Sequence, residues 1–337
     1  KTKMRGNIKM SDIARQMGVS VVTVSKALNG KEGVSKELRE KIIAKTRELG
    51  YSISSAAKAV QTNNVLGILI AQRYLDHHSF YWSMFQHIQV KLCENNYFGV
   101  LEICTDEQEA ALTPPKIVSE KKVENLVVIG QFSRAYLSLL TDNVENLIFI
   151  DFYDTEIDTY NILADNIMGG YKMTKYLIRH GHKDIMFVGN IHSTVSILDR
   201  AMGYVKCMLK YKMPLRSVWH ISDRNEQGRY IPLNLPSSLP SAFICNNDVV
   251  AHRLVETLEL AGKKVPDDIS IVSFDNYFHG DPETFITTID FSVEKYSDAL
   301  IKLLNNLKTN NCTSTIKESI YLNGTMIENH SVKDISK

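Results

Sequence analysis

The stretch SDIARQMGVSVVTVSKALN, from Ser11 to Asn29, determines how the first part of this chain folds. It predicts two short helices joined at Gly18, with Ser20 as the N-cap of the second helix. Apolar residues recur four apart within each helix, at Ile13, Met17, Val24 and Leu28. A helix, a tight turn and a second helix with a polar outer face form a unit that fits the major groove of DNA. The alternative is an ordinary helical hairpin packed in a protein core.

The distribution of charge favours the DNA-binding interpretation. The residues up to Asn64 carry 13 basic and 5 acidic side chains, a net charge of +8, whereas the rest of the chain carries 26 basic and 33 acidic side chains, a net charge of −7. The net charge of +1 for the whole chain therefore conceals a basic head on an acidic body. A basic head neutralises DNA phosphates, and binding of this kind weakens as salt is added.

Two further helical segments precede the first apolar strand. A third helix is predicted from Ser35, its N-cap, to Leu49, with Gly50 just past its end. The segment Ser54–Gln61 is rich in Ala and Lys, but a helix of eight residues is only marginally stable alone in water. This segment is either ordered by DNA or by the same segment of a second chain, or it is a flexible linker.

From Val65 onward, short apolar runs alternate with helical patterns. This alternation predicts parallel sheets covered by helices on both faces, with enough elements for two doubly wound units. The predicted strands are Val65–Ala71, Val100–Cys104, Leu126–Ile129, Leu147–Ile150, Ile185–Val188, Ala242–Cys245 and Ile269–Phe274. The predicted helices are Tyr81–Asn95, Met168–Arg179, Leu198–Lys212, Val249–Ala261 and Val293–Leu307. Ligands of such folds bind beyond the carboxyl ends of the strands, where Asn246–Asp248 and Asp275–Asn276 stand.

Composition and missing motifs argue against several other classes of protein. At 337 residues, the chain is long enough for two or three domains. It has no long apolar run, and its five cysteines form no CxxC pair, so we expect a cytoplasmic protein with no membrane segment. It has no phosphate loop, nucleophile elbow or HExxH motif, and its paired histidines, His77–His78 and His180 with His182, are isolated. We therefore expect no enzymatic activity, no cofactor and no metal.

Over nearly its whole length the chain resembles the LacI/GalR (lactose-repressor-like) family of transcription regulators. The family's head is matched by Val19-Ser20, Thr23-Val24-Ser25, Leu28-Asn29-Gly30, Val34-Ser35 and Leu49-Gly50-Tyr51. The family's core is matched by Asp165-Asn166, Gly169-Gly170-Tyr171, Gly181-His182, Asp199-Arg200, Gly203-Tyr204, Asn247-Asp248 and the run from Val265 to Asp275. The resemblance implies a small all-α helix-turn-helix head and an α/β core of two doubly wound parallel-sheet subdomains, similar to periplasmic binding proteins.

The resemblance also implies the domain organisation. The helix-turn-helix domain spans residues 1–52, and the hinge helix and linker span residues 53–64. The effector-binding core spans residues 65–337. Its N-terminal subdomain comprises about 65–163 and 292–316, and its C-terminal subdomain comprises about 164–291 and 317–337. The carboxyl-terminal tail shows no leucine heptads, so we expect a homodimer that places two reading helices on a pseudo-palindromic DNA operator.

The resemblance assigns DNA contacts by position to Ser20, Val21, Val22, Thr23, Ser25, Lys26 and Asn29, and to Lys58 and Val60 in the hinge. Lys26 can donate to a guanine edge or to a phosphate, whereas Val21 and Val22 can make only apolar contacts, for example with a thymine methyl group. Val60 stands where the family inserts a leucine wedge into the minor groove, so we expect a shallower wedge. Ile53 replaces a frequent proline and leaves the entrance to the hinge less rigid.

The resemblance assigns the effector site to Asp76, Phe80, Tyr81, Asp151, Ser196, Arg200, Asn247 and Asp275, and Trp219 is a candidate stacking surface for a sugar ring. Carboxylates accept hydrogen bonds from neighbouring hydroxyls, and Arg and Asn donate in fixed directions, so this set suits a sugar or a sugar derivative. Each residue also has a structural interpretation, with Arg200 as the partner of Asp199, Trp219 as core and Asp275 as a turn cap.

One stretch departs from the family pattern. Between Ser222 and Ser241, relatives usually have a helix, but Pro232, Pro236 and Pro240 prevent a single helix here, so we expect an irregular loop beside the cleft. The resulting prediction is a transcription regulator, a repressor, whose operator affinity is controlled by a small effector, most readily a carbohydrate. Two alternatives stay open. One is the same architecture with a purine or other non-sugar effector, and the other is a DNA-binding head fused to a sugar-acting enzyme.

Overall fold

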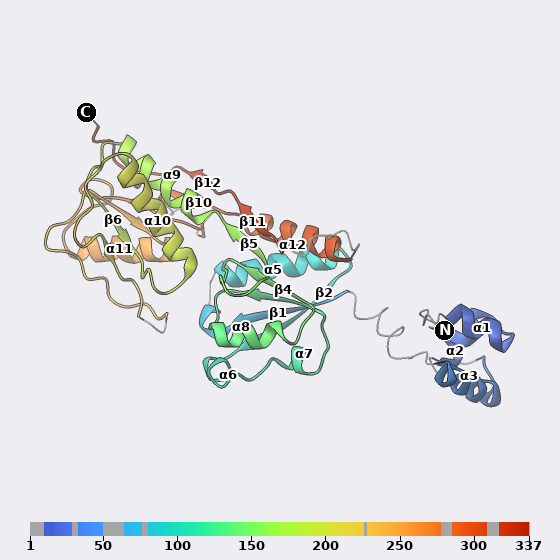
Figure 1. Cartoon of the computed structure of the whole chain (residues 1–337). Helices are drawn as coiled ribbons and strands as arrows, with labels where there is room; N and C mark the ends of the chain where they lie inside the picture. Colours follow the sequence, from blue (N-terminus) through green and yellow to red (C-terminus); the bar gives the residue numbers. More distant parts are fainter. Residues whose placement is uncertain are drawn as a thin grey trace, which may run out of the picture. The chain divides into compact units, whose positions relative to one another are not determined.

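The computed structural model describes residues 10–28, 33–49, 64–75, 80–225, 228–277, 285–308 and 317–336. Backbone contacts divide the chain into two compact units, Lys1–Asn63 and Asn64–Lys337 (Figure 1). Several predictions lie outside the described residues: the hinge helix at 54–61, Asp76 of the effector set, and Asn29, Lys58 and Val60 of the DNA-binding set.

The first unit contains three short helices, α1 (Met10–Met17), α2 (Val21–Leu28) and α3 (Lys36–Glu48). Gly18 turns the chain between α1 and α2 with a φ of 66°, a conformation that favours glycine. The Ser20 hydroxyl caps α2 by accepting the Thr23 N–H at 3.0 Å. The core consists of Ile13, Ala14, Val24, Ala27 and Ile42. The two predicted helices, their turn and their cap are confirmed.

The second unit begins with a six-stranded parallel sheet in the order β11-β5-β4-β3-β1-β2. Its strands are β1 (Val65–Ala71), β2 (Phe98–Cys104), β3 (Asn125–Ile129), β4 (Asn146–Ile150), β5 (Tyr160–Ala164) and β11 (Ser319–Leu322). Successive side chains of β1 enter different cores, because Ile68 and Ile70 face α5 (Phe80–Glu94) and α12 (Val293–Lys308), whereas Leu69 faces the opposite layer. That layer contains α6 (Asp106–Ala110), α7 (Lys116–Ser119) and α8 (Arg134–Thr141).

A second parallel sheet, in the order β7-β6-β8-β9, forms the other subdomain. Its strands are β6 (Ile185–Val188), β7 (His220–Ile221), β8 (Ala242–Cys245) and β9 (Ser270–Val272). One face is covered by α9 (Asn166–Arg179) and α10 (Val195–Lys210), and the other by α11 (Asp248–Leu260). An antiparallel pair, β10 (Thr288–Asp290) and β12 (Thr325–Ile327), completes the unit. The predicted α/β core with two parallel sheets is confirmed.

The structure differs from the sequence prediction at one boundary and agrees with it at one loop. The final segment was expected to join the C-terminal subdomain from residue 317, but β11 pairs with β5 in the first sheet, so the chain leaves that sheet only after Leu322. Between Ser222 and Ser241, the described residues contain no helix and only an isolated bridge between Arg224 and Tyr230, as the prolines predicted. Within the described parts of the chain, no helix has the length and apolar character needed to cross a bilayer.

Candidate functional site

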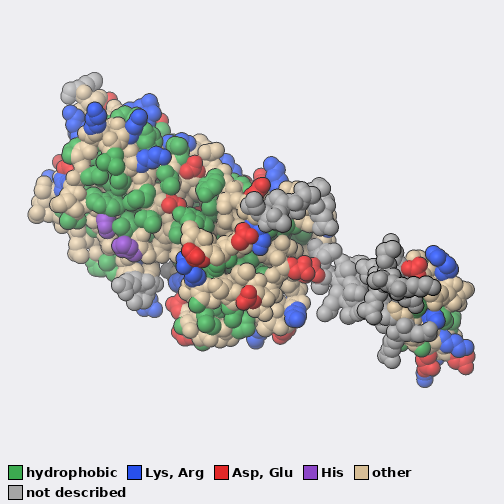
Figure 2. Space-filling view, viewed as in Figure 1, with side chains coloured by type: hydrophobic (Ala, Val, Ile, Leu, Met, Phe, Trp, Pro, Cys, Tyr) green, Lys and Arg blue, Asp and Glu red, His purple; other side chains and the backbone are tan. Residues whose placement is uncertain are grey.

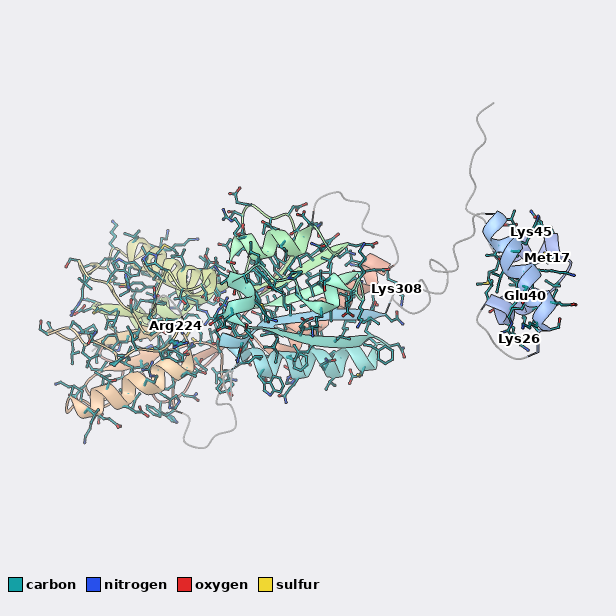
Figure 3. All side chains as sticks on the ribbon, turned by 90° about the horizontal axis from the view of Figure 1, so that it is seen from below. Met17, Lys26, Glu40, Lys45, Arg224 and Lys308 are labelled. Atoms are coloured by element: carbon teal, nitrogen blue, oxygen red, sulfur yellow. The ribbon has the colours of Figure 1, made fainter. Side chains whose placement is uncertain are left out.

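The outer surface of α2 is the candidate DNA-reading surface of the head. Val24 and Ala27 are buried, which leaves Ser20, Lys26, Val21 (46% exposed) and Val22 (64% exposed) on the surface. Thr23 and Ser25 are half-buried, and the Thr23 hydroxyl is 2.8 Å from that of Ser20. Lys26 lies near the C-terminal end of α2, clear of the helix core (Figure 3). The surface therefore combines one cation, small polar groups and two apolar side chains, which can meet phosphates and base edges.

The candidate effector site lies where the two sheets present the carboxyl ends of their strands. Asp151 directly follows β4, and Asp275 stands three residues past β9. Both have positive φ angles, 67° for Asp151 and 95° for Asp275, a conformation that few non-glycine residues adopt and that Asp adopts more readily than most. Arg200 projects from the second turn of α10 and is only 5% exposed.

Arg200 is held by partners from three segments of the chain. Its Nε donates to Asn166 Oδ1 at 2.8 Å, and Nη1 donates to the Asn246 carbonyl at 2.5 Å. Its Nη2 lies 2.9 Å from Asp275 Oδ1 in an ion pair. The guanidinium also lies 4.7 Å from the centre of the Phe274 ring. A buried guanidinium held in this way has a fixed donor geometry, which is what a directional binding site requires.

The glycines between α9 and α10 explain how Arg200 comes so close to Asn166. A Cβ atom on Gly170 would overlap the carbonyl oxygen of Arg200, and one on Gly203 would overlap the carbonyl oxygen of Ile167. The two helices can therefore approach this closely only with glycine at both positions. This contact sets the position of Arg200 relative to the start of α9.

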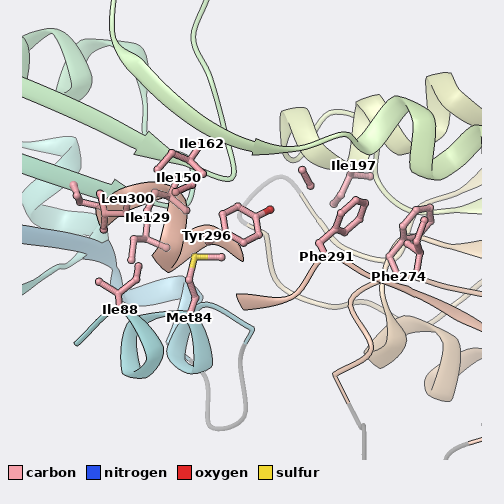
Figure 4. Close-up of a cluster of buried hydrophobic side chains, with 14 of the residues drawn as sticks. Met84, Ile88, Ile129, Ile150, Ile162, Ile197, Phe274, Phe291, Tyr296 and Leu300 are labelled. Atoms are coloured by element: carbon pink, nitrogen blue, oxygen red, sulfur yellow. The ribbon is translucent and has the colours of Figure 1, made fainter. Parts of the chain in front are cut away.

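The carboxylate of Asp151 accepts hydrogen bonds from two tyrosine hydroxyls. Tyr81 donates to Oδ2 at 2.9 Å, and Tyr296 donates to Oδ1 at 2.9 Å. Burial raises the pKa of Asp151 above its usual value, the charge of Arg200 lowers it, and that of Asp275 raises it further. These electrostatic interactions connect a carboxylate of the first sheet with charged groups of the second. Figure 4 shows Tyr296 at the edge of the aliphatic cluster around Ile129 and Leu300.

Asp275 differs from Asp151 because part of its carboxylate is free to accept a hydrogen bond. Oδ1 is buried and forms the ion pair with Arg200, but no described donor makes a hydrogen bond of good geometry to it. A carboxylate oxygen has two lone pairs, so a ligand hydroxyl or N–H could donate to Oδ1 beside the guanidinium of Arg200. This carboxylate is the clearest acceptor for a bound molecule in the described core.

The other predicted effector residues divide into two groups. Phe80 and Tyr81 begin α5 beside Tyr296, with ring centres of Phe80 and Tyr296 6.2 Å apart. Ser196 lies one turn before Arg200 on α10, and its hydroxyl is 3.0 Å from that of Thr194. Among the described residues, no hydrogen bond or ring contact links Asn247 or Trp219 to the Asp151–Arg200–Asp275 cluster, and the side-chain nitrogen of Asn247 lies 3.5 Å from the Tyr230 hydroxyl.

Asn247 and Trp219 have local structural partners. Asn247 caps α11 by accepting the Val250 N–H at 2.9 Å. Trp219 precedes β7, at the opposite end of the sheet from Asp275, and packs 6.0 Å from the Tyr204 ring and 4.7 Å from the His220 ring, centre to centre.

Several residues of the site were not found from the sequence. Tyr296 comes from α12, far from Asp151 in the chain, and Asn166 and Asn246 act through single hydrogen bonds to Arg200. A second charged cluster lies in the irregular segment, where the fully buried Asp223 pairs with Arg224 at 2.8 Å. The Arg224 guanidinium stacks over Tyr230 at 4.8 Å. The sequence indicated an irregular loop here, because the prolines of this segment exclude a single helix, but it did not indicate the pair of Asp223 and Arg224.

Asp248 fixes the loop that carries Asp275. Its Oδ1 accepts the hydroxyl of Ser273 and, at 2.8 Å, that of Thr288, and its Oδ2 accepts the Tyr277 N–H at 2.8 Å. The Asp248 N–H also donates to the Phe274 carbonyl at 3.0 Å. Burial raises the pKa of Asp248 to about 7. The start of α11 is thus joined to the end of β9 and to β10 through one carboxyl group.

Comparisons with known proteins match both parts of this architecture. Residues 9–54 match the model of bacterial regulatory proteins of the lacI family, and residues 174–332 match a periplasmic binding protein-like domain. The HTH-type transcriptional repressor PurR of Histophilus somni is 28% identical over 315 residues, covering 88% of this chain and 90% of the relative. The ribose operon repressor of Haemophilus influenzae is 27% identical over 275 residues, covering 79% of this chain and 81% of the relative.

Solved structures show the same fold. The lac repressor dimer bound to operator and the anti-inducer ONPF is 19% identical, has a TM-score of 0.66, and is matched over 97% of this chain and 100% of that chain. The complex of the transcriptional regulator CelR with cellobiose is also 19% identical, with a TM-score of 0.64 over 96% of this chain and 99% of that chain. The chain therefore combines a helix-turn-helix head of the lacI family of bacterial regulatory proteins with a periplasmic-binding-protein-like core, and the curated relatives that it matches over most of their length are transcriptional repressors.

Proposed function

We propose that this protein represses transcription as a cytoplasmic homodimer whose affinity for a pseudo-palindromic operator is controlled by a sugar or sugar derivative. The effector binds at Asp151, Arg200 and Asp275, between the two subdomains of the core. The relatives named above are transcriptional repressors, which supports a regulatory and not an enzymatic role.

The observation that carries this proposal is the buried charge cluster shared by the two sheets. Asp151 belongs to the first sheet, and Arg200 and Asp275 belong to the second, so a ligand that bonds to all three is sensitive to how the subdomains are placed. The carboxylate of Asp275 has acceptor capacity to spare, and the guanidinium of Arg200 is fixed by its neighbours. Coupling between two sites of this kind is typically worth about 1–3 kcal/mol.

A purine is the second candidate for the effector. The PurR relatives and the tyrosines beside Asp151 favour it, because aromatic rings can stack on a base. The density of charged acceptors and directed donors favours a polyol, since each hydroxyl both donates and accepts. The ribose operon repressor and the cellobiose complex among the matches are consistent with a sugar.

The experiment that tests the proposal has two stages, both with the full chain. Duplexes that bind the purified protein are selected from random DNA, and the strongest duplex serves as the operator. The melting temperature of the protein is then measured against concentration series of pentoses, hexoses, disaccharides, sugar phosphates and free purine bases. A true ligand raises the melting temperature as its concentration increases.

We expect a sugar to raise the melting temperature and to change operator affinity. In Asp275→Asn this response is reduced, while operator binding without ligand is retained. A shift produced only by purine bases would replace the sugar with the second candidate. If no duplex is enriched over random DNA at low salt, the protein is not a sequence-specific regulator.

A further inference from the structure

The face of the C-terminal subdomain formed by α9 and α10 is strongly basic, although the core as a whole is acidic. Lys172, Lys175 and Arg179 lie three and four residues apart on α9, and Lys206 and Lys210 lie four apart on α10, so each set shares one side of its helix. Among the described residues, none of these five cations forms an ion pair with a carboxylate. Lys172 Nζ is 3.5 Å from the Gly324 carbonyl oxygen.

Two apolar grooves lie between these cations. The larger has a volume of about 470 Å³ and is lined by Ile167, Met168 and Tyr171 on one side and by Lys206 and Lys210 on the other. Ile167 and Met168 are 40% and 41% exposed, more than hydrophobic side chains of a helix packed on a sheet usually are.

The smaller groove has a volume of about 200 Å³ and is lined by Lys172, Lys175, Tyr176, Arg179 and Met326. An acidic residue lies beside this groove, because burial and, after it, the charge of Glu328 raise the pKa of Tyr176. Figure 2 shows hydrophobic surface where α10 lies, with Lys and Arg side chains along the border of the subdomain. Charge and apolar surface are thus combined on one face, in the manner of a surface that binds an amphipathic segment.

The chemistry of this face selects among possible partners. A second copy of the same face would bring five cations against five cations, which is electrostatically unfavourable. Nucleic acid would satisfy the cations, but phosphates and sugars do not fill grooves lined by Ile167, Met168 and Met326. A protein segment with apolar side chains flanked by carboxylates satisfies both parts of the surface.

We propose that the face formed by α9 and α10 is a docking surface for an acidic, amphipathic segment of another protein. Its apolar side chains enter the two grooves, and its carboxylates pair with Lys172, Lys175, Arg179, Lys206 and Lys210. This proposal does not depend on the identity of the effector, because the site lies on the outer side of these helices, whereas Arg200 points inward.

The test measures binding of labelled synthetic peptides to the full chain by fluorescence anisotropy. The first peptide is an amphipathic helix of about 18 residues with leucines on one side and glutamates on the other. The second has the same composition in scrambled order, and the third has lysine in place of glutamate. We expect the first peptide to bind more tightly than either of the others.

Three variants separate this face from the basic head. The double variant Lys206→Glu with Lys210→Glu should weaken binding of the first peptide by about tenfold or more, because attraction becomes repulsion. The matched control, Lys116→Glu with Lys302→Glu, makes the same change at two exposed lysines of the N-terminal subdomain and should leave binding unchanged. Met168→Gln, at an exposed position, should also weaken binding, because the larger groove loses apolar surface.

Three results would overturn the proposal. The first is equal loss in the double variant and its control, and the second is full binding by Met168→Gln. The third is a loss of affinity of the Lys206/Lys210 variant for an unrelated DNA duplex as large as its loss for the peptide, which would identify nucleic acid as the partner. Unchanged melting temperatures of all three variants verify that they are folded.

Discussion

Lys26 is the exposed cation of α2, on the surface that also presents Val21 and Val22. Replacement of Lys26 by Ala should weaken operator binding by about 1–3 kcal/mol if its ammonium group contacts a base edge, and should affect random DNA much less. Lys41→Ala, on the exposed side of α3, is the matched control and should change both affinities by similar small amounts. Titration of each variant with the operator and with a random duplex measures the two effects. Equal losses for Lys26→Ala on both duplexes would identify a phosphate contact.

Arg200 should matter more for stability than any exposed arginine of the core. Arg200→Gln removes the charge that faces Asp151 and Asp275, and breaking a buried pair of this kind costs about 3–5 kcal/mol. Arg134→Gln is the control, because the 58% exposed side chain of Arg134 pairs with Asp154 through a single 3.0 Å contact and should contribute at most about 1 kcal/mol. Denaturant unfolding measures both changes. Similar losses in the two variants would mean that the Arg200 cluster is open to water.

Asp248 should make the stability of the core depend on pH. The pKa of Asp248 is about 7 in the folded protein, and its ordinary value is 3.8. Between pH 3.8 and pH 7 the folded state therefore keeps a proton that the unfolded state has lost. The free energy of unfolding therefore falls as pH rises through this window, by up to about 1.4 kcal/mol per pH unit. Asp199, whose pKa burial raises to about 6, contributes in the same direction.

The variant Asp248→Asn isolates the contribution of this carboxyl group. Its free energy of unfolding should decline less steeply between about pH 4 and pH 7 than that of the unchanged protein, because the titrating group is absent and Asp199 remains. Asn247→Ala, at the neighbouring position, keeps Asp248 and should keep the full slope. Parallel pH profiles for the unchanged protein and Asp248→Asn would show that Asp248 is ionised in the folded state throughout.

At the level of elements, the sequence predicted most of the strands that are buried on both faces, but it missed the buried strand β5 as well as the shortest strands and one edge strand. The ranges Val65–Ala71, Ile185–Val188 and Ala242–Cys245 agree with β1, β6 and β8, because each is a continuous apolar run in the centre of a parallel sheet. The strand β7 has only two residues, and β11 is an edge strand with alternating exposure, so neither has a distinctive pattern. Their pairing is determined by tertiary contacts.

The sequence predicted only part of the candidate site, because some of its residues come together only through tertiary contacts. Asp151, Arg200 and Asp275 stand at positions that a family pattern can identify, and the structure brings them together. Tyr296 enters the site only because α12 returns to the first sheet, which no local pattern reports. Trp219 was a candidate stacking surface, but it precedes β7, at the end of the sheet opposite Asp275, and packs against Tyr204.

The contact between α9 and α10 gives a test at this scale. Gly203→Ala places a methyl group against the backbone of Ile167, where no side chain can move aside, so the helices must separate. We expect a loss of about 1–3 kcal/mol in stability and a weaker effector response, because Arg200 moves away from Asn166 and Asp275. Leu198→Ala, at a 37% exposed position of the same helix, is the control. An unchanged effector response in a destabilised Gly203→Ala would separate helix packing from the site.

At the level of the whole molecule, the two units have opposite charge. The head carries a net charge of +8, and the rest of the chain carries −7, so the net attraction to DNA comes from the head, although the core has a locally basic face on α9 and α10. Repulsion by the core reduces binding to arbitrary DNA, where contacts are purely electrostatic.

Salt provides the last test, because it acts on the electrostatic part of binding alone. A dimer with two basic heads that makes six to ten phosphate contacts should lose operator affinity by about 10³-fold or more between about 50 and 200 mM salt. Lys26→Ala should lower the slope of log affinity against log salt only if Lys26 contacts a phosphate.

Insertion of about five base pairs between the operator half-sites rotates one half-site by half a helical turn and should strongly weaken the binding of a dimer. Full affinity for the lengthened operator, together with a shallow salt slope, would mean that a single head binds DNA independently.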